Sequence, residues 1–100
     1  MIATLQNGIL DKIALKIIQE QELIVGPLAW IEAAKVNGLD LIDRKSAQIH
    51  IDHGDPKEVI NGLVSRYERL FGEASHEVCR EAALPLVADL SPSDIPSSLQ

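Results

Sequence analysis

The sequence is poor in residues that could stabilise a small protein covalently. It contains one cysteine, Cys79, among 100 residues, so it cannot form an internal disulfide. A disulfide-free domain of this size depends on packing, as is usual in a reducing compartment, and we therefore expect a cytoplasmic protein. The sequence shows no basic region followed by a long apolar run at its start, and its longest apolar run is interrupted by Gly26 and Pro27. Neither export nor a membrane anchor is expected.

Aromatic side chains and positive charge are also scarce. Trp30, Tyr67 and Phe71 are the only aromatic residues, which leaves few platforms on which bases or sugars could stack. Nine basic against fifteen acidic residues give a net charge of −6, which repels phosphate backbones and anionic lipid surfaces. The composition therefore disfavours nucleic acid and membranes as partners. It favours a protein partner, or self-association as a homodimer.

Aliphatic side chains are what the sequence has in quantity. Hydrophobic residues make up 46% of the chain and charged residues 24%, which is typical of a globular domain and not of a disordered chain. One hundred residues can bury one core but not two. We expect a single globular domain over residues 1–90. Residues 91–100, in which serine and proline are frequent, are expected to form a flexible tail.

Helical periodicity predicts two helices in the first part of the chain. The first runs from about Gly8 to Glu22, with Asn7 as its N-cap, because apolar residues recur there at spacings of three and four. The second runs from Pro27 to Val36 and is closed by Asn37 and Gly38, a pair that tolerates positive φ.

Two further helices are predicted in the second part. One begins with the clearest local signal of the chain, in which Asp55 caps the helix, Pro56 takes its first position and Glu58 follows three residues after the cap. This helix should run to Phe71 and end at Gly72. The other should start from a Ser75 cap, and Pro85 inside it should kink or split it.

The apolar period changes to two between the second and third predicted helices. Apolar and polar residues alternate over residues 39–41 and again over 48–52, on either side of a polar segment. This pattern predicts a two-stranded β-hairpin. The expected fold class is therefore α+β and mainly helical, in the order helix-helix-β-hairpin-helix-helix, with a four-helix framework and one hairpin.

Two pairs of metal-ligating residue types are spaced three apart. They are His50 with His53 and His76 with Cys79, and together they could supply four zinc ligands. However, residues three apart in a strand point to opposite faces, and Cys79 lies on the apolar face of its helix. We therefore predict no metal and no cofactor, and keep these four residues as the alternative.

Catalytic chemistry finds no support in the sequence. Nucleophilic catalysis needs a nucleophile beside an oriented base, and the only such candidate is Cys79 with a nearby histidine. A thiol in apolar surroundings is inert, because its thiolate is disfavoured. The sequence contains neither a glycine-rich phosphate loop nor a nucleophile elbow. We predict a protein that is not an enzyme and has no catalytic residues.

DNA binding is the secondary hypothesis. Two helices joined by a short turn and followed by a hairpin imitate the order of elements in a winged-helix domain. Arg44 and Lys45 at the hairpin tip, with Lys35 in the second helix, would then contact the nucleic acid. The second helix offers few side chains that read base edges, and the sequence has no basic patch.

The main hypothesis, reached largely by elimination, is a small acidic protein-interaction or regulatory module. The first predicted helix is apolar over more of its circumference than a surface helix of a monomer needs, because Ile9 and Leu15 widen its apolar stripe. We take Ile9, Leu15 and Trp30 as candidate contact residues. In the alternative, the first helix is sandwiched between the hairpin and the third helix, and the wide stripe belongs to the core. No motif identifies the partner.

Overall fold

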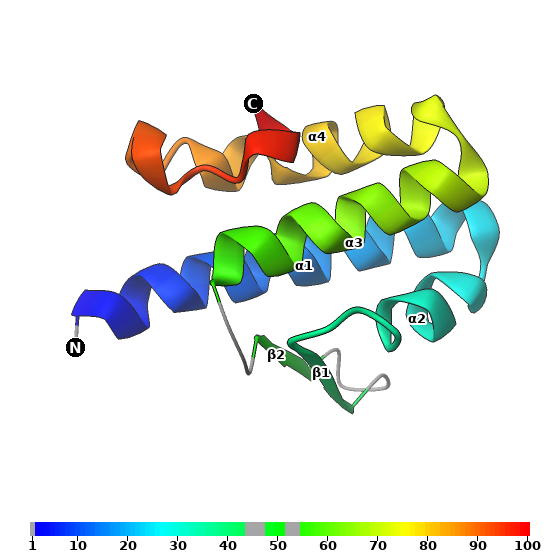
Figure 1. The fold of residues 1–100 in the computed structure, drawn as a ribbon, viewed down its shortest axis with the longest axis horizontal. Helices are drawn as coiled ribbons and strands as arrows, with labels where there is room; N and C mark the ends of the chain where they lie inside the picture. Colours follow the sequence, from blue (N-terminus) through cyan, green and yellow to red (C-terminus); the bar gives the residue numbers. More distant parts are fainter. Residues whose placement is uncertain (1, 44–47, 52–54) are drawn as a thin grey trace.

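Three long helices lie alongside one another in the computed structural model, which describes residues 2–43, 48–51 and 55–100 (Figure 1). Of residues 2–7, 40–43, 48 and 50 only the backbone is described. The helices along the chain are α1 (Ile2–Val25), α2 (Leu28–Ala33), α3 (Pro56–Phe71) and α4 (Glu73–Val87). Two extended segments, β1 (Leu39–Asp43) and β2 (Gln48–Ile51), separate α2 from α3, and two short 3-10 turns, η1 (Pro92–Asp94) and η2 (Ser97–Leu99), follow α4.

α1 is the central element of the core. It packs against α4, α2, α3 and β2, so it has neighbours on several sides. Ile13, Ile17 and Ile18 are completely buried, at the spacing that places them on one face of a helix. Ile9 and Leu15, which widen this stripe, are half-buried and pack against the same core. The breadth of the apolar face on α1 thus follows from its central position.

The predicted fold class, α+β with a two-stranded hairpin, is wrong, because helices build the fold and no sheet forms a layer in the described part of the chain. β1 and β2 pair as a short ribbon of extended chain, and the register of the pairing shifts after Leu41. Of the ribbon side chains that the structure describes, Leu39 and Ile51 belong to the buried core, and Ile49 packs against it half-buried. The predicted tip, with Arg44 and Lys45, lies outside the described residues. Two short strands bury little apolar surface, so the helices decide the class.

α3 begins and ends where the sequence predicts. The Asp55 carboxylate accepts a hydrogen bond from the backbone N–H of Lys57 at 3.0 Å, and Pro56 occupies the first turn. Gly72 follows the last residue with φ of 95°, a conformation that costs glycine little. Local capping chemistry therefore determines both ends of this helix.

α1 and α2 differ from their predicted bounds. α1 begins at Ile2 instead of Gly8 and continues to Val25, so Asn7 lies inside the helix and is not its cap. A glycine inside a helix costs only about 1 kcal/mol relative to alanine, which is too little to end it. α2 ends at Ala33, because the N–H groups of Lys35 and Val36 bond to carbonyls three residues back and tighten the last turn.

α4 starts earlier than predicted and is not split. Gly72 ends α3 and directly precedes α4, which begins at Glu73, so Ser75 is buried in the first turn and is not a cap. Pro85 lies within the helix, which nevertheless continues to Val87. The proline removes one backbone hydrogen bond near the end of the helix, where fewer such bonds remain to be lost.

The C-terminal segment, predicted to be a flexible tail, folds back along α3 and α4 (Figure 1). Leu90 and Leu99 belong to the core, and Pro96 is completely buried. The described core thus extends past the predicted domain boundary at residue 90. No helix among the described residues is both long and apolar enough to cross a membrane.

Candidate interaction site

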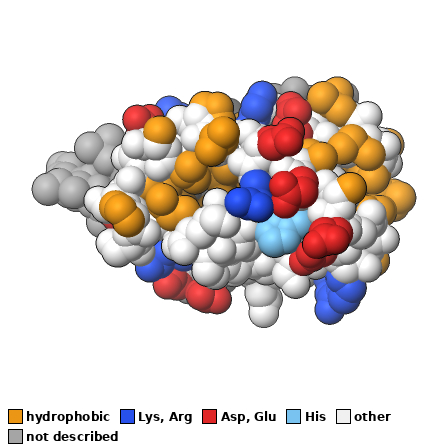
Figure 2. Space-filling view, turned by 90° about the horizontal axis from the view of Figure 1, so that it is seen from above, with side chains coloured by type: hydrophobic (Ala, Val, Ile, Leu, Met, Phe, Trp, Pro, Cys, Tyr) orange, Lys and Arg blue, Asp and Glu red, His pale blue; other side chains and the backbone are white. Residues whose placement is uncertain are grey.

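Several large hydrophobic side chains remain exposed on the helices. Two of them are adjacent at the C-terminal end of α1, where Leu23 is 80% exposed and Ile24 is 59% exposed. Figure 2, which looks down on the molecule of Figure 1, shows hydrophobic side chains gathered in separate areas, with charged side chains and a histidine between them. Among the side chains that the structure describes, the exposed large hydrophobic ones are Leu23, Ile24, Leu28, Ile31, Leu70 and Leu84.

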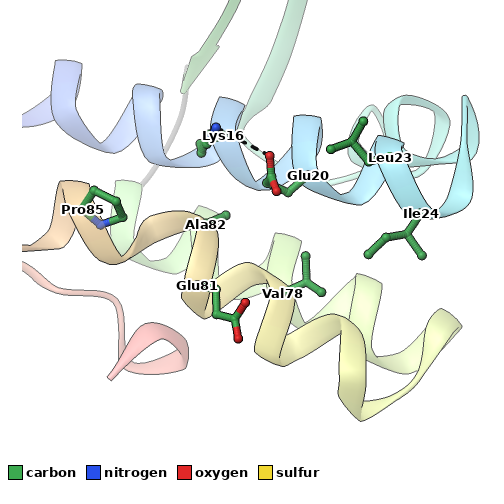
Figure 3. Close-up of a pocket in the computed structure, with 8 residues that line it drawn as sticks. All are labelled: Lys16, Glu20, Leu23, Ile24, Val78, Glu81, Ala82 and Pro85. Carbon is green, nitrogen blue, oxygen red and sulfur yellow. Dashed lines mark ion pairs between the residues drawn. The ribbon is translucent and has the colours of Figure 1, made fainter.

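A groove of about 400 Å³ runs between α1 and α4 and contains the exposed pair (Figure 3). We call it the α1/α4 groove. Its lining comes from one face of each helix, at positions 16, 20, 23 and 24 of α1 and positions 78, 81, 82 and 85 of α4. These spacings of three, four and seven place the four residues of each helix on a common face. Its lining residues are Lys16, Glu20, Leu23, Ile24, Val78, Glu81, Ala82 and Pro85.

The charged residues of the groove lie beside its apolar lining. The Lys16 Nζ atom is 3.5 Å from the Glu20 Oε2 atom, one helical turn away, and this pair neutralises itself (Figure 3). Glu81 has no ion-pair partner among the residues that the structure describes. The groove therefore combines apolar side chains with the negative charge of Glu81, which no described cation pairs with, in a chain whose net charge is −6.

None of the three predicted contact residues lines the α1/α4 groove. Ile9 and Leu15 are half-buried against the core, and Trp30 is only 4% exposed. The Trp30 Nε1 atom is buried without a hydrogen-bond partner among the described residues. The sequence signal that would have located the groove is the spacing of Lys16, Glu20, Leu23 and Ile24, a second face of α1 beside the core stripe.

His76 and Cys79, one predicted metal-ligating pair, lie in different surroundings. Cys79 is completely buried, and its Sγ atom accepts a hydrogen bond from Gln21 Nε2 at 3.4 Å. Burial raises the pKa of this thiol to about 11. His76 is half-buried and contacts the C-terminal segment.

The other predicted pair is His50 with His53. The side chain of His50 and the whole of His53 lie outside the described residues. Within the described ranges, no three His, Cys, Asp or Glu side chains come close enough together to hold a metal ion.

Of the basic residues named for DNA binding, Lys35 lies in the described part of the chain. Lys35 is exposed, and its Nζ atom is 3.2 Å from Glu32 Oε2. Arg66 of α3 donates to the same carboxylate at 2.9 Å, and this bond lowers the pKa of Glu32. Both cations are thus paired with one carboxylate. Arg44 and Lys45 lie outside the described residues.

Gln21 is a buried polar residue that the sequence reasoning missed. Its Nε2 atom donates to the Ser75 carbonyl oxygen at 2.9 Å and links α1 to α4. Its Oε1 atom is buried without a partner in the described part of the chain. Its burial could have been predicted from its position, because Gln21 lies four residues after Ile17 and three after Ile18 and so falls on the core stripe of α1.

No protein-family model matches the chain, and no curated protein or solved structure is significantly similar to it.

Proposed function

We propose that this protein is a small acidic interaction module without catalytic chemistry, which binds a basic amphipathic helix of a partner protein in the α1/α4 groove. The observation that carries the proposal is the exposure of Leu23 and Ile24 beside Val78 of α4. Large apolar side chains that gather on the surface of a small protein are typical of interaction sites.

The shape of the groove favours a helix as its occupant. Positions 16 to 24 of α1 span about 12 Å at 1.5 Å per residue, which corresponds to roughly two helical turns. A third helix laid between two neighbouring helices can pack its side chains into the groove that they form. Two turns supply apolar anchors at i, i+3 or i+4 and i+7, the usual pattern of a helix bound in a groove.

The charge of the protein favours a basic partner. Glu81 at the groove is unpaired within the described residues, and the whole chain carries −6. A second copy would bring the same negative charge, so electrostatics favour a different, basic protein over a homodimer. We do not propose duplex DNA, because Lys35 and Arg66 already pair with Glu32.

A designed peptide can test the proposal. The probe is an amphipathic peptide of about 14 residues built from leucine and lysine, and its control has glutamate in place of each lysine. Calorimetry should detect saturable binding of the Leu/Lys peptide in the micromolar range, weakened by added salt. Leu23→Glu should weaken it at least about tenfold, because a charge would be desolvated in the contact.

Leu70→Glu is the matched control, because Leu70 is also exposed, at 48%, but belongs to α3 and does not line the groove. This variant should bind the peptide as the parent protein does. Equal binding of the Leu/Lys and Leu/Glu peptides would contradict a basic partner. If light scattering shows a stable dimer that Leu23→Glu dissociates, the occupant of the groove is a second copy of this chain and not a helix of another protein.

A further inference from the structure

Side chains from two helices form hydrogen bonds with Ser98 of the C-terminal segment. The Asn61 Oδ1 atom of α3 accepts hydrogen bonds from the Ser98 backbone N–H at 3.0 Å and from its hydroxyl at 2.6 Å. On the other side, the His76 Nε2 atom of α4 lies 2.6 Å from the Ser98 carbonyl oxygen. The N–H and the C=O of Ser98 are therefore both held by side chains.

The second ring nitrogen of His76 also faces an acceptor. Its Nδ1 atom is 3.3 Å from the Glu68 Oε2 atom of α3. A carbonyl oxygen and an ionised carboxylate only accept hydrogen bonds, and a neutral imidazole carries a single N–H. Only the imidazolium form of His76 can donate to Ser98 and Glu68 at the same time.

We propose that protonated His76 is a pH-dependent latch that holds residues 95–99 in the crevice between α3 and α4. This inference is independent of the α1/α4 groove, since none of the latch residues lines that groove. When the latch opens, Pro96 and Leu99, which are buried in the docked segment, become available to solvent together with the α3 and α4 surface that they cover.

The charged groups around His76 favour its protonated form. α3 contributes Glu68, and α4 contributes Glu77, whose carboxylate also pairs with Arg80 at 3.1 Å. The hydrogen bond to the Ser98 carbonyl raises the pKa of His76 most, Glu68 and Glu77 raise it further, and partial burial opposes them.

The direction of the pH effect follows from this raised pKa. A histidine whose pKa is higher in the docked than in the undocked state stabilises docking at low pH. We expect the contribution to be complete below the pKa that His76 has in the undocked state and to disappear as the pH rises through its higher pKa in the docked state. The docking equilibrium constant should change tenfold for each pH unit between the docked and undocked pKa values of His76.

NMR on the full chain tests the latch by two independent measurements. Titration of the His76 ring gives its pKa, and hydrogen exchange at the Ser98 and Leu99 amides, corrected for intrinsic rates, gives the docking equilibrium at each pH. We expect protection of both amides to decrease from about pH 5.5 to pH 8.5 across the range in which His76 titrates. Amides of α3, such as that of Leu63, report on global stability and should change less.

His76→Gln is the decisive variant, because glutamine can donate to the Ser98 carbonyl without titrating. It keeps His50 and His53, so it separates the effect of His76 from theirs. Its tail amides should be protected to the same extent at both pH values. The latch is refuted if the parent shows no pH dependence of tail protection, or if His76→Gln retains it. Should the variant fail to fold, a His76 pKa at or below the ordinary value would refute the latch equally.

Discussion

The thiol of Cys79 shows how packing controls the chemistry of a single side chain. It is completely buried, and that burial raises its pKa to about 11, so little thiolate forms at neutral pH. We predict that a thiol reagent labels Cys79 at least about 100-fold more slowly in native buffer than in urea, because labelling requires opening of the core. The measurement is the labelling rate followed by absorbance. Rapid native labelling would show that the site is accessible.

Asp55 has an equally local role at the start of α3. Its carboxylate accepts from Lys57 N–H at 3.0 Å and satisfies a backbone donor that the helix leaves unpaired. Asp55→Ala should lower the free energy of unfolding, measured by urea denaturation, by about 1 kcal/mol. Asp55→Ser, which retains a capping oxygen, should recover most of the loss. If both variants match the parent protein, this cap does not stabilise the fold.

At the scale of elements, α1 has one face for the core and another for the α1/α4 groove. Leu15 is half-buried against the core, whereas Leu23 is 80% exposed. Leu15→Glu should therefore lower the free energy of unfolding by about 2 kcal/mol, because it moves a charge into apolar surroundings. Leu23→Glu should change it by less than about 0.5 kcal/mol. Urea denaturation of both variants checks this, and equal effects would contradict the assignment of the two faces.

The element that the sequence predicted best, α3, is the one whose ends depend on neighbouring residues. The ends of α3 are determined by helix capping and by the first-turn proline, which act over a few positions only. The residues responsible are Asp55, Pro56 and Gly72. The class was mispredicted because alternation over residues 39–51 is a local signal, while the class depends on which elements form the core. Leu39 and Ile51, at the outer ends of the two segments, are the ribbon residues buried there among the side chains that the structure describes.

The residues that form the candidate site could not be predicted from the sequence alone, for a similar reason. Lys16, Glu20, Leu23 and Ile24 lie on one face of α1, and this much could have been read from their spacing. Which residues of α4 lie opposite depends on how the two helices are rotated against each other, and only packing determines that rotation. The sequence favours Ile9 and Leu15 as contact residues because it does not reveal how many neighbours α1 has.

At the scale of the whole molecule, α4 separates two features with different chemistry. The α1/α4 groove has a largely apolar lining and a carboxylate, that of Glu81, with no ion-pair partner among the described residues, whereas the crevice on the α3 side is filled by the C-terminal segment. The net charge of −6 is a property of the whole chain and could be taken from the sequence directly. Whether this net charge favours a partner depends on where apolar surface is exposed beside it. The position of that surface is known only from the fold.

The most direct measurement of the central claim is a map of backbone amide chemical shifts during titration with the Leu/Lys peptide. The shifts should concentrate on α1 between Lys16 and Ile24 and on α4 between Val78 and Ala82, which line the α1/α4 groove. They should saturate and should be lost in Leu23→Glu. Shifts concentrated on α3 and the C-terminal segment, or a titration that does not saturate, would contradict the claim that this groove is a docking site.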